Sequence, residues 1–157
     1  MKKIGEYTAR GVVTESETEA GNMQKIPLFD GRFDTGYRIT GFKIWASTYT
    51  GSSEPDCIGK LSKNPDGVRT GGSFMRADDN NQVAWAASAG STDGGLGFGE
   101  GPIIDRDNMV IEDLYVYVRT TGGQTNPINY LVEMDKYDIT DWQGALAMAR
   151  DRAQGDL

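Results

Sequence analysis

Few residues of this chain are suited to catalysis, because it contains no histidine and only one cysteine, Cys57. Without histidine, the chain by itself cannot form a Ser-His-Asp triad, a Cys-His pair or an imidazole metal site. Cys57 has no second cysteine for an internal disulfide, and we expect it to be a small buried residue. The best enzyme hypothesis without histidine is a pair of carboxylates, as in glycoside hydrolysis.

The most suggestive carboxylates lie in the segments 109–120 and 128–139, where alternating residues predict two strands. We expect a hairpin around the intervening TGGQTNP, in a register that joins the aliphatic faces of the two strands. The predicted inward residues are Val110, Leu114, Val116, Val118, Ile128, Tyr130, Val132 and Met134. Three acidic residues and three tyrosines then share the opposite face: Asp113, Glu133, Asp135, Tyr115, Tyr117 and Tyr137.

Carboxylates that face each other across strands repel, so such a face requires basic side chains, a cation, a neighbouring chain or water. Acidic residues beside aromatic rings also resemble a sugar-binding face. Three interpretations stay open at this point: a catalytic pair, a site for a cation or ligand, and a solvated or contact surface. We predict no metal and no other cofactor.

The glycine-rich segment STDGGLGFGEG (91–101) fits none of three ligand-binding patterns. The dinucleotide pattern G-x-G-x-x-G fails at Glu100, and the phosphate-loop pattern lacks its Lys-Ser/Thr pair. The calcium repeat G-G-x-G-x-D fails at Gly99 and occurs once, whereas its architecture needs several stacked copies. We therefore expect a pliable loop that presents Leu96 and Phe98 to another chain. The other predicted assembly contacts are the tyrosines of the outer sheet face, Tyr115, Tyr117 and Tyr137.

The segment DRDNMVIED (105–113) is rich in oxygen ligands, which invites comparison with the EF-hand loop. That loop needs an oxygen ligand at its fifth position and glycine at its sixth. Counted from Asp105, those positions hold Met109 and Val110. The match fails, and a turn before a strand explains the acidic residues.

Alternating segments separated by turn signals predict about eight antiparallel strands, the pattern of a β-sandwich or jelly roll. In the strand over 37–47, Phe42, Ile44 and Ala46 share one face. We expect Trp45 and Trp85 to pack in the core or on a sheet. The other predicted strands in the first part of the chain cover 5–14, 23–31, 56–62, 68–77 and 82–88.

The last segment has helical spacing. Thr140 is a suitable N-cap, with Gln143 three residues later as in a capping box. An apolar face follows, formed by Trp142, Leu146, Ala149 and Ala153. We therefore predict one domain, with a β body over 1–139 and a C-terminal helix and tail over 140–157 packed on it.

The composition argues against several partners. Over 157 residues the net charge is −7 and the pI about 4.6, and the only basic cluster is Lys2-Lys3. Direct nucleic-acid binding by charge is therefore not expected. The start MKKIGEYTARG has no apolar signal region, and no segment is long and apolar enough to span a membrane. We expect synthesis in the cytoplasm and no membrane partner.

Two segments resemble small structural proteins of marine bacteriophage particles. They are LFDGRFDTGYRITGFKIW (28–45) and VIEDLYVYV…NPINYLVEMDKYDITDWQGALAMARDRAQ (110–154). The resemblance carries no catalytic motif and no functional residue. It implies a non-enzymatic capsid or capsid-decoration subunit, located in the virion, whose partners are copies of itself and other virion proteins.

The alternative is a carbohydrate-binding or carbohydrate-cleaving jelly roll that uses Asp113, Glu133 and the nearby tyrosines.

Overall fold

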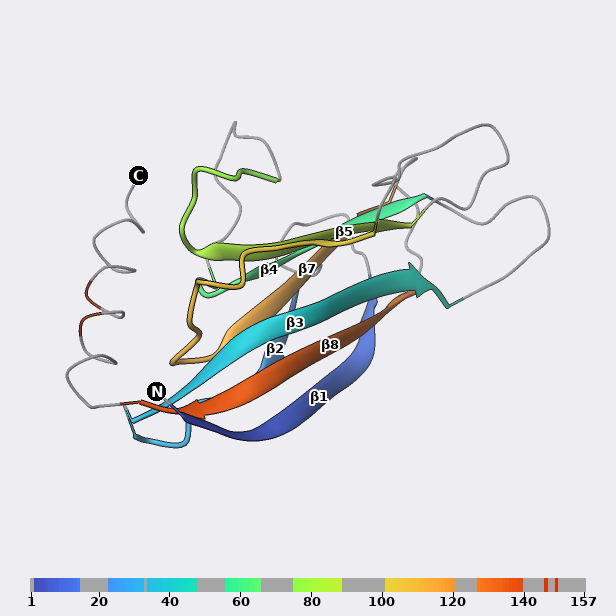
Figure 1. Cartoon of the computed structure of the whole chain (residues 1–157). Coiled ribbons are helices and arrows are strands. Elements are labelled where there is room, and N and C mark those ends of the chain that lie inside the picture. Colours follow the sequence, from blue (N-terminus) through green and yellow to red (C-terminus); the bar gives the residue numbers. More distant parts are fainter. Residues whose placement is uncertain are drawn as a thin grey trace.

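The computed structural model describes residues 2–14, 23–32, 34–47, 56–65, 75–88, 101–120 and 127–139, together with Leu146 and Ala149. This part of the chain is mainly β and forms two antiparallel sheets (Figure 1). Its strands are β1 (Lys2–Thr14), β2 (Met23–Ile26), β3 (Thr35–Ala46), β4 (Cys57–Ser62), β5 (Gln82–Ser88), β6 (Ile103–Ile104), β7 (Leu114–Thr120) and β8 (Pro127–Asp138).

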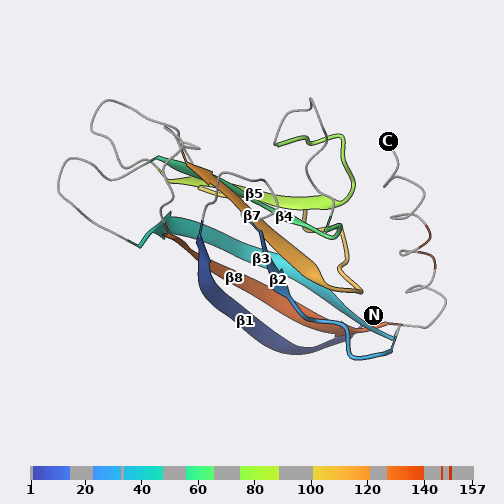
Figure 2. The same ribbon diagram turned by 180° about the vertical axis from the view of Figure 1, so that it is seen from behind.

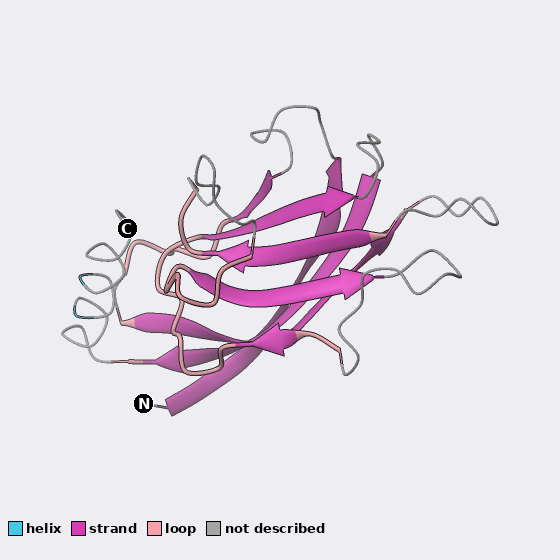
Figure 3. Cartoon of the chain, turned by 90° about the horizontal axis from the view of Figure 1, so that it is seen from above, coloured by secondary structure: helices cyan, strands magenta, loops and turns pink. Residues whose placement is uncertain are grey.

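The three-stranded sheet has the order β1-β8-β3, and the five-stranded sheet has the order β2-β7-β4-β5-β6. Figures 1 and 2 show the long strands β1, β8 and β3 side by side in one layer and β4, β5 and β7 in the other. The view from above shows the same two layers (Figure 3). The layers contact each other where β3 meets β4 and β5, and where β1 meets β2 and β7.

One hydrophobic core lies between the sheets, because the inward faces of both contribute to a single cluster of buried side chains. In the three-stranded sheet, Ala9, Val132 and Phe42 form one inward row across β1, β8 and β3. In the five-stranded sheet, Val116, Leu61 and Ala84 form such a row across β7, β4 and β5. The predicted inward set of the two C-terminal strands is confirmed: Val110, Leu114, Val116, Val118, Ile128, Tyr130, Val132 and Met134 are all buried.

The predicted hairpin between the two C-terminal strands is wrong. Strand β7 pairs with β2 and β4, whereas β8 pairs with β1 and β3. The aliphatic faces of β7 and β8 do meet, but across the core between two sheets rather than side by side in one sheet. An alternating pattern specifies which face of a strand is buried and leaves its neighbour in the sheet unspecified.

The burial of individual side chains shows which of them enter the core. The adjacent Val12 and Val13 divide between the two faces of β1, with Val13 buried and Val12 exposed. Cys57 is buried, as predicted. Trp85 is half-buried, whereas Trp45 is 42% exposed on β3, so of the two predicted positions for Trp45 the core is excluded and the surface of a sheet remains.

The C-terminal helix predicted over 140–157 falls mostly outside the described residues. Leu146 and Ala149 are described, both have helical backbone, and both are exposed. The predicted strand over 68–77 lies outside the described residues up to position 74, and 75–77 are not in a strand. Among the described residues, no helix has the length and apolar character needed to cross a membrane.

Candidate functional site

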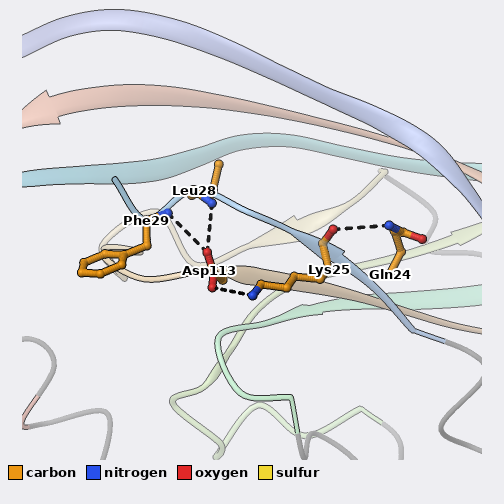
Figure 4. A network of polar contacts seen from close by, with 5 residues as sticks. All are labelled: Gln24, Lys25, Leu28, Phe29 and Asp113. Atoms are coloured by element: carbon orange, nitrogen blue, oxygen red, sulfur yellow. Dashed lines mark hydrogen bonds and ion pairs between the residues drawn. The ribbon is translucent and has the colours of Figure 1, made fainter. Parts of the chain in front are cut away.

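Asp113, the first of the predicted acidic residues, holds the end of β2 against the start of β7 (Figure 4). Its Oδ1 accepts hydrogen bonds from the backbone N–H groups of Leu28 at 3.1 Å and Phe29 at 3.3 Å. Its Oδ2 lies 3.1 Å from Nζ of Lys25, which is in β2. The carboxylate is therefore engaged by three donors from one neighbouring segment.

The pKa of Asp113 reflects these contacts. Burial by itself raises the pKa of this carboxyl group, but Lys25 and the N–H groups of Phe29 and Leu28 outweigh it, and the net pKa is below the ordinary value. Correspondingly, the hydrogen bond from Lys25 to Asp113 raises the pKa of Lys25. An ionised, fully engaged carboxylate suits a positioning role and does not suit a general acid.

Glu133 and Asp135 lie in the other sheet, on the outer face of β8, which is the face turned away from β7. In this sheet Glu133 stands opposite Thr8 and Gly41. Its side chain covers Gly41, since a Cβ placed there would lie 2.9 Å from Glu133 Oε2. Asp135 forms a 3.1 Å ion pair with Lys3. The structure thus brings Glu133 and Asp135 together on one strand and separates Asp113 from them.

No metal centre is formed by these acids. Within the described ranges, no three Asp, Glu or Cys side chains gather closely enough to hold an ion. The single acidic face predicted from the hairpin is therefore not assembled, because its members belong to two different sheets.

The three tyrosines are also divided between the sheets, and Tyr117 does not face solvent. It is 3% exposed, and its hydroxyl donates hydrogen bonds to the backbone oxygens of Asn64, at 3.2 Å, and Pro65. The ammonium group of Lys60, which is itself buried, lies 5.3 Å from the centre of the Tyr117 ring. The prediction of Tyr117 as an exposed assembly contact is therefore wrong.

Tyr115 is half-buried on β7, and Tyr137 is half-buried on β8, with the Arg38 guanidinium 5.0 Å from its ring centre. The predicted contact residues Leu96 and Phe98 lie outside the described residues. Of the glycine-rich segment only Gly101 is described, and its φ of 94° lies in the region that favours glycine.

The exposed apolar side chains gather elsewhere, on β1. Ile4 is 52%, Tyr7 47% and Val12 48% exposed, and only Ala9 and Val13 of this strand are buried. Strand β1 pairs with β8 on one side and is the outermost strand of its sheet on the other. We therefore take the β1 edge as the candidate functional site, an edge available for contact with another chain.

The sequence reasoning missed Ile4, Tyr7 and Val12 as surface residues. One signal was present: two adjacent valines in a strand must point to opposite faces, so either Val12 or Val13 had to leave the core. The exposed Trp45 shares the outer face of this sheet with Val12. Trp45 and Val12 lie on either side of Asn129 in one row on the outer face of the three-stranded sheet.

The comparisons with known proteins do not place the chain in a family. No family model matches the chain. A segment of 92 residues is 32% identical to the B-subunit of Type 2 DNA topoisomerase 6 from two Halobacterium salinarum strains. The match covers 59% of this chain, and the chain spans only 11% of the length of that relative.

Proposed function

We propose that the two sheets form a β-sandwich of the jelly-roll type. The jelly-roll topology is supported by the order in which the strands pair, from the two ends of the chain inward: β1 pairs with β8, β2 with β7, and β4 with β5. The remaining pair in this order, β3 and β6, is in contact. When a long hairpin wraps into two sheets, its first strand pairs with its last strand and its second strand with its second-last strand.

We propose further that the chain is a non-enzymatic structural subunit of a bacteriophage particle, either a capsid or a capsid-decoration protein. Jelly rolls serve as viral capsid and lectin domains. The observation that carries the proposal is the β1 edge, where a strand of 13 residues exposes Ile4, Tyr7 and Val12. Such an edge is a template for contact with another chain. The resemblance to phage structural proteins supplies the biological setting.

The carbohydrate alternative loses the arrangement on which it was built. It required Asp113 and Glu133 beside tyrosines on one face, and these residues lie in different sheets. Asp113 is in addition held by Lys25, Leu28 and Phe29. No described arrangement favours this alternative, and we do not propose it as a second function.

Particle association is the direct test. An antibody against the purified chain should label phage particles in electron micrographs, and the chain should co-sediment with particles from an infected lysate. The purified chain should also form oligomers at micromolar concentration in sedimentation velocity. A chain that stays monomeric and never accompanies particles would overturn the proposal.

The topoisomerase match makes DNA a necessary second ligand to test. With a net charge of −7 and no basic arm, we expect no retardation of a DNA duplex at any salt concentration. Salt-dependent binding of the purified chain to DNA would contradict the proposed role and favour a nucleic-acid function.

A further inference from the structure

The free side of β1 is the longest unpaired strand edge in the described part of the chain. In the three-stranded sheet the opposite edge, β3, is engaged by a two-way backbone pairing between Tyr37 and Val110. Strand β1 has no described strand on its second side. Figure 1 shows it as the outermost ribbon of its layer. Its free N–H and C=O groups are arranged to accept one further strand.

Two oppositely charged residues of β1, Glu6 and Arg10, lie on either side of the strand midpoint. At one end, Glu6 stands opposite Asp135, and Lys3 bridges both carboxylates at 2.8 and 3.1 Å. At the other end, Arg10 stands in a row with Leu131 and Lys43. Within the described chain Arg10 forms no ion pair. Glu6 is therefore an exposed carboxylate on one side of the strand midpoint, and Arg10 is an exposed cation on the other side.

We propose that β1 pairs antiparallel with β1 of a second copy of this chain, about a twofold axis at Thr8. This deepens the proposed structural role by naming the partner at the exposed edge. The pairing joins two three-stranded sheets into one continuous sheet with the order β3-β8-β1-β1-β8-β3. Because the contact is isologous, it closes on itself and yields a discrete dimer as a building block.

The register follows from three independent requirements. Thr8 is the midpoint of Lys2–Thr14, so pairing about it overlaps the whole strand. It sets Glu6 opposite Arg10 of the second copy, twice by symmetry, so that each Arg10 gains a carboxylate partner across the axis. Cross-strand pairs of opposite charge stabilise a sheet and like pairs destabilise it.

The apolar residues match in the same register. Ile4 and Val12, both about half exposed, come near each other at each end of the paired segment, just beyond the regular stretch, because Ile4 lies in the register shift of β1. On the inward side, the large Tyr7 comes opposite the small Ala9. The register shift between Lys3 and Gly5 lies at the outer end of the strand, so the pairing from Gly5 to Gly11 around the axis is regular.

Neighbouring registers lose these matches. The hydrophobic cores of the two copies lie on the same side of the joined sheet only if even-numbered residues of one β1 pair with even-numbered residues of the other. An axis at Tyr7 would set Glu6 opposite Thr8, and an axis at Ala9 would set it opposite Val12. Neither forms an ion pair, so the charge pattern selects Thr8.

The first test is a charge exchange, read out as the dimer dissociation constant by sedimentation at low salt. Arg10→Glu and Glu6→Arg should each weaken the dimer roughly tenfold or more, because two opposite-charge pairs become like-charge pairs. The double variant E6R/R10E should restore most of the affinity, since it exchanges the partners. The control Lys43→Glu makes the same charge change on β3 and should leave dimerisation unchanged.

The second test fixes the register by cross-linking. In an antiparallel pair, opposed Cα atoms lie about 4.5–5.5 Å apart, which is within the range of a disulfide. Thr8→Cys should therefore give a covalent dimer under mild oxidation. The native Cys57 is buried and leaves a low background. The control Thr14→Cys places the two thiols at opposite ends of the paired strands and should remain monomeric.

The inference is overturned if the double variant is no better than the single ones, or if Thr8→Cys and Thr14→Cys cross-link equally. Its failure is distinguishable from failure of the structural role. A chain that labels particles but shows no effect of these variants keeps the role and loses the β1 pairing. A chain that forms the dimer but never accompanies particles keeps the pairing and loses the role.

Discussion

Lys25 and Asp113 form a 3.1 Å ion pair that joins β2 to the residue immediately before β7. The same carboxylate accepts the backbone N–H groups of Leu28 and Phe29. Asp113, which the sequence suggested for ligand binding, therefore holds β2 against the start of β7.

Replacing Asp113 with alanine should lower the free energy of unfolding by about 1–3 kcal/mol, because the partly buried N–H group of Leu28 and the exposed N–H group of Phe29 lose a charged acceptor. Asp113→Asn keeps an acceptor oxygen and should cost less. Urea denaturation at pH 7 measures both effects. Asp107→Ala, at an exposed position in the same part of the chain, is the matched control and should change stability by less than about 0.5 kcal/mol. Equal effects at both positions would contradict the anchoring role.

The contribution of Asp113 should depend on pH. Its folded pKa is depressed below the ordinary value of 3.8, so the folded state binds this proton less readily than the unfolded state. The stabilisation is therefore complete above the ordinary value and is lost as pH falls through the folded pKa. Denaturation of the wild type and Asp113→Asn at pH 7, 5 and 3 should show a difference that shrinks at the lowest pH. A difference that grew on acidification would refute this assignment.

Tyr117→Phe should destabilise the fold by about 1 kcal/mol, because it removes the hydroxyl that donates to Asn64 and Pro65. Thermal or urea unfolding measures the change. The control is Tyr115→Phe on the same strand, where the ring is half-buried and we expect a change within about 0.5 kcal/mol. If both substitutions were neutral, the buried hydroxyl would have no part in stability.

Gly59→Val should destabilise by about 1–3 kcal/mol through overpacking of the core. Even a Cβ at this position would lie 3.1 Å from Ile44 Cδ1, a side chain of the facing sheet, and 3.2 Å from the Tyr117 backbone oxygen. Gly5→Val is the matched control, since a Cβ at Gly5 meets nothing within 4 Å. We expect no loss there, because a β-branched residue suits a strand. A larger loss at Gly5 than at Gly59 would contradict the close approach of the two sheets.

The amino-acid sequence alone specified where most strands run and which side chains they bury. The alternation around Phe42 and Ile44 placed β3, and that around Val116 and Val132 placed the strands labelled β7 and β8. These properties are local, since successive side chains of a strand point to opposite faces and the apolar ones must leave water. The short β6 was not predicted, because two residues give no alternation.

The choice of neighbouring strands came from tertiary packing. A connection of six residues, 121–126, suggested that β7 and β8 pair, yet they belong to facing sheets. Backbone hydrogen bonds are alike for every partner, and sheets about 10 Å apart are within reach of such a connection. Partner choice is therefore set by nonlocal burial. That choice separated Asp113 from Glu133, buried Tyr117, and left β1 with its charged and apolar edge exposed.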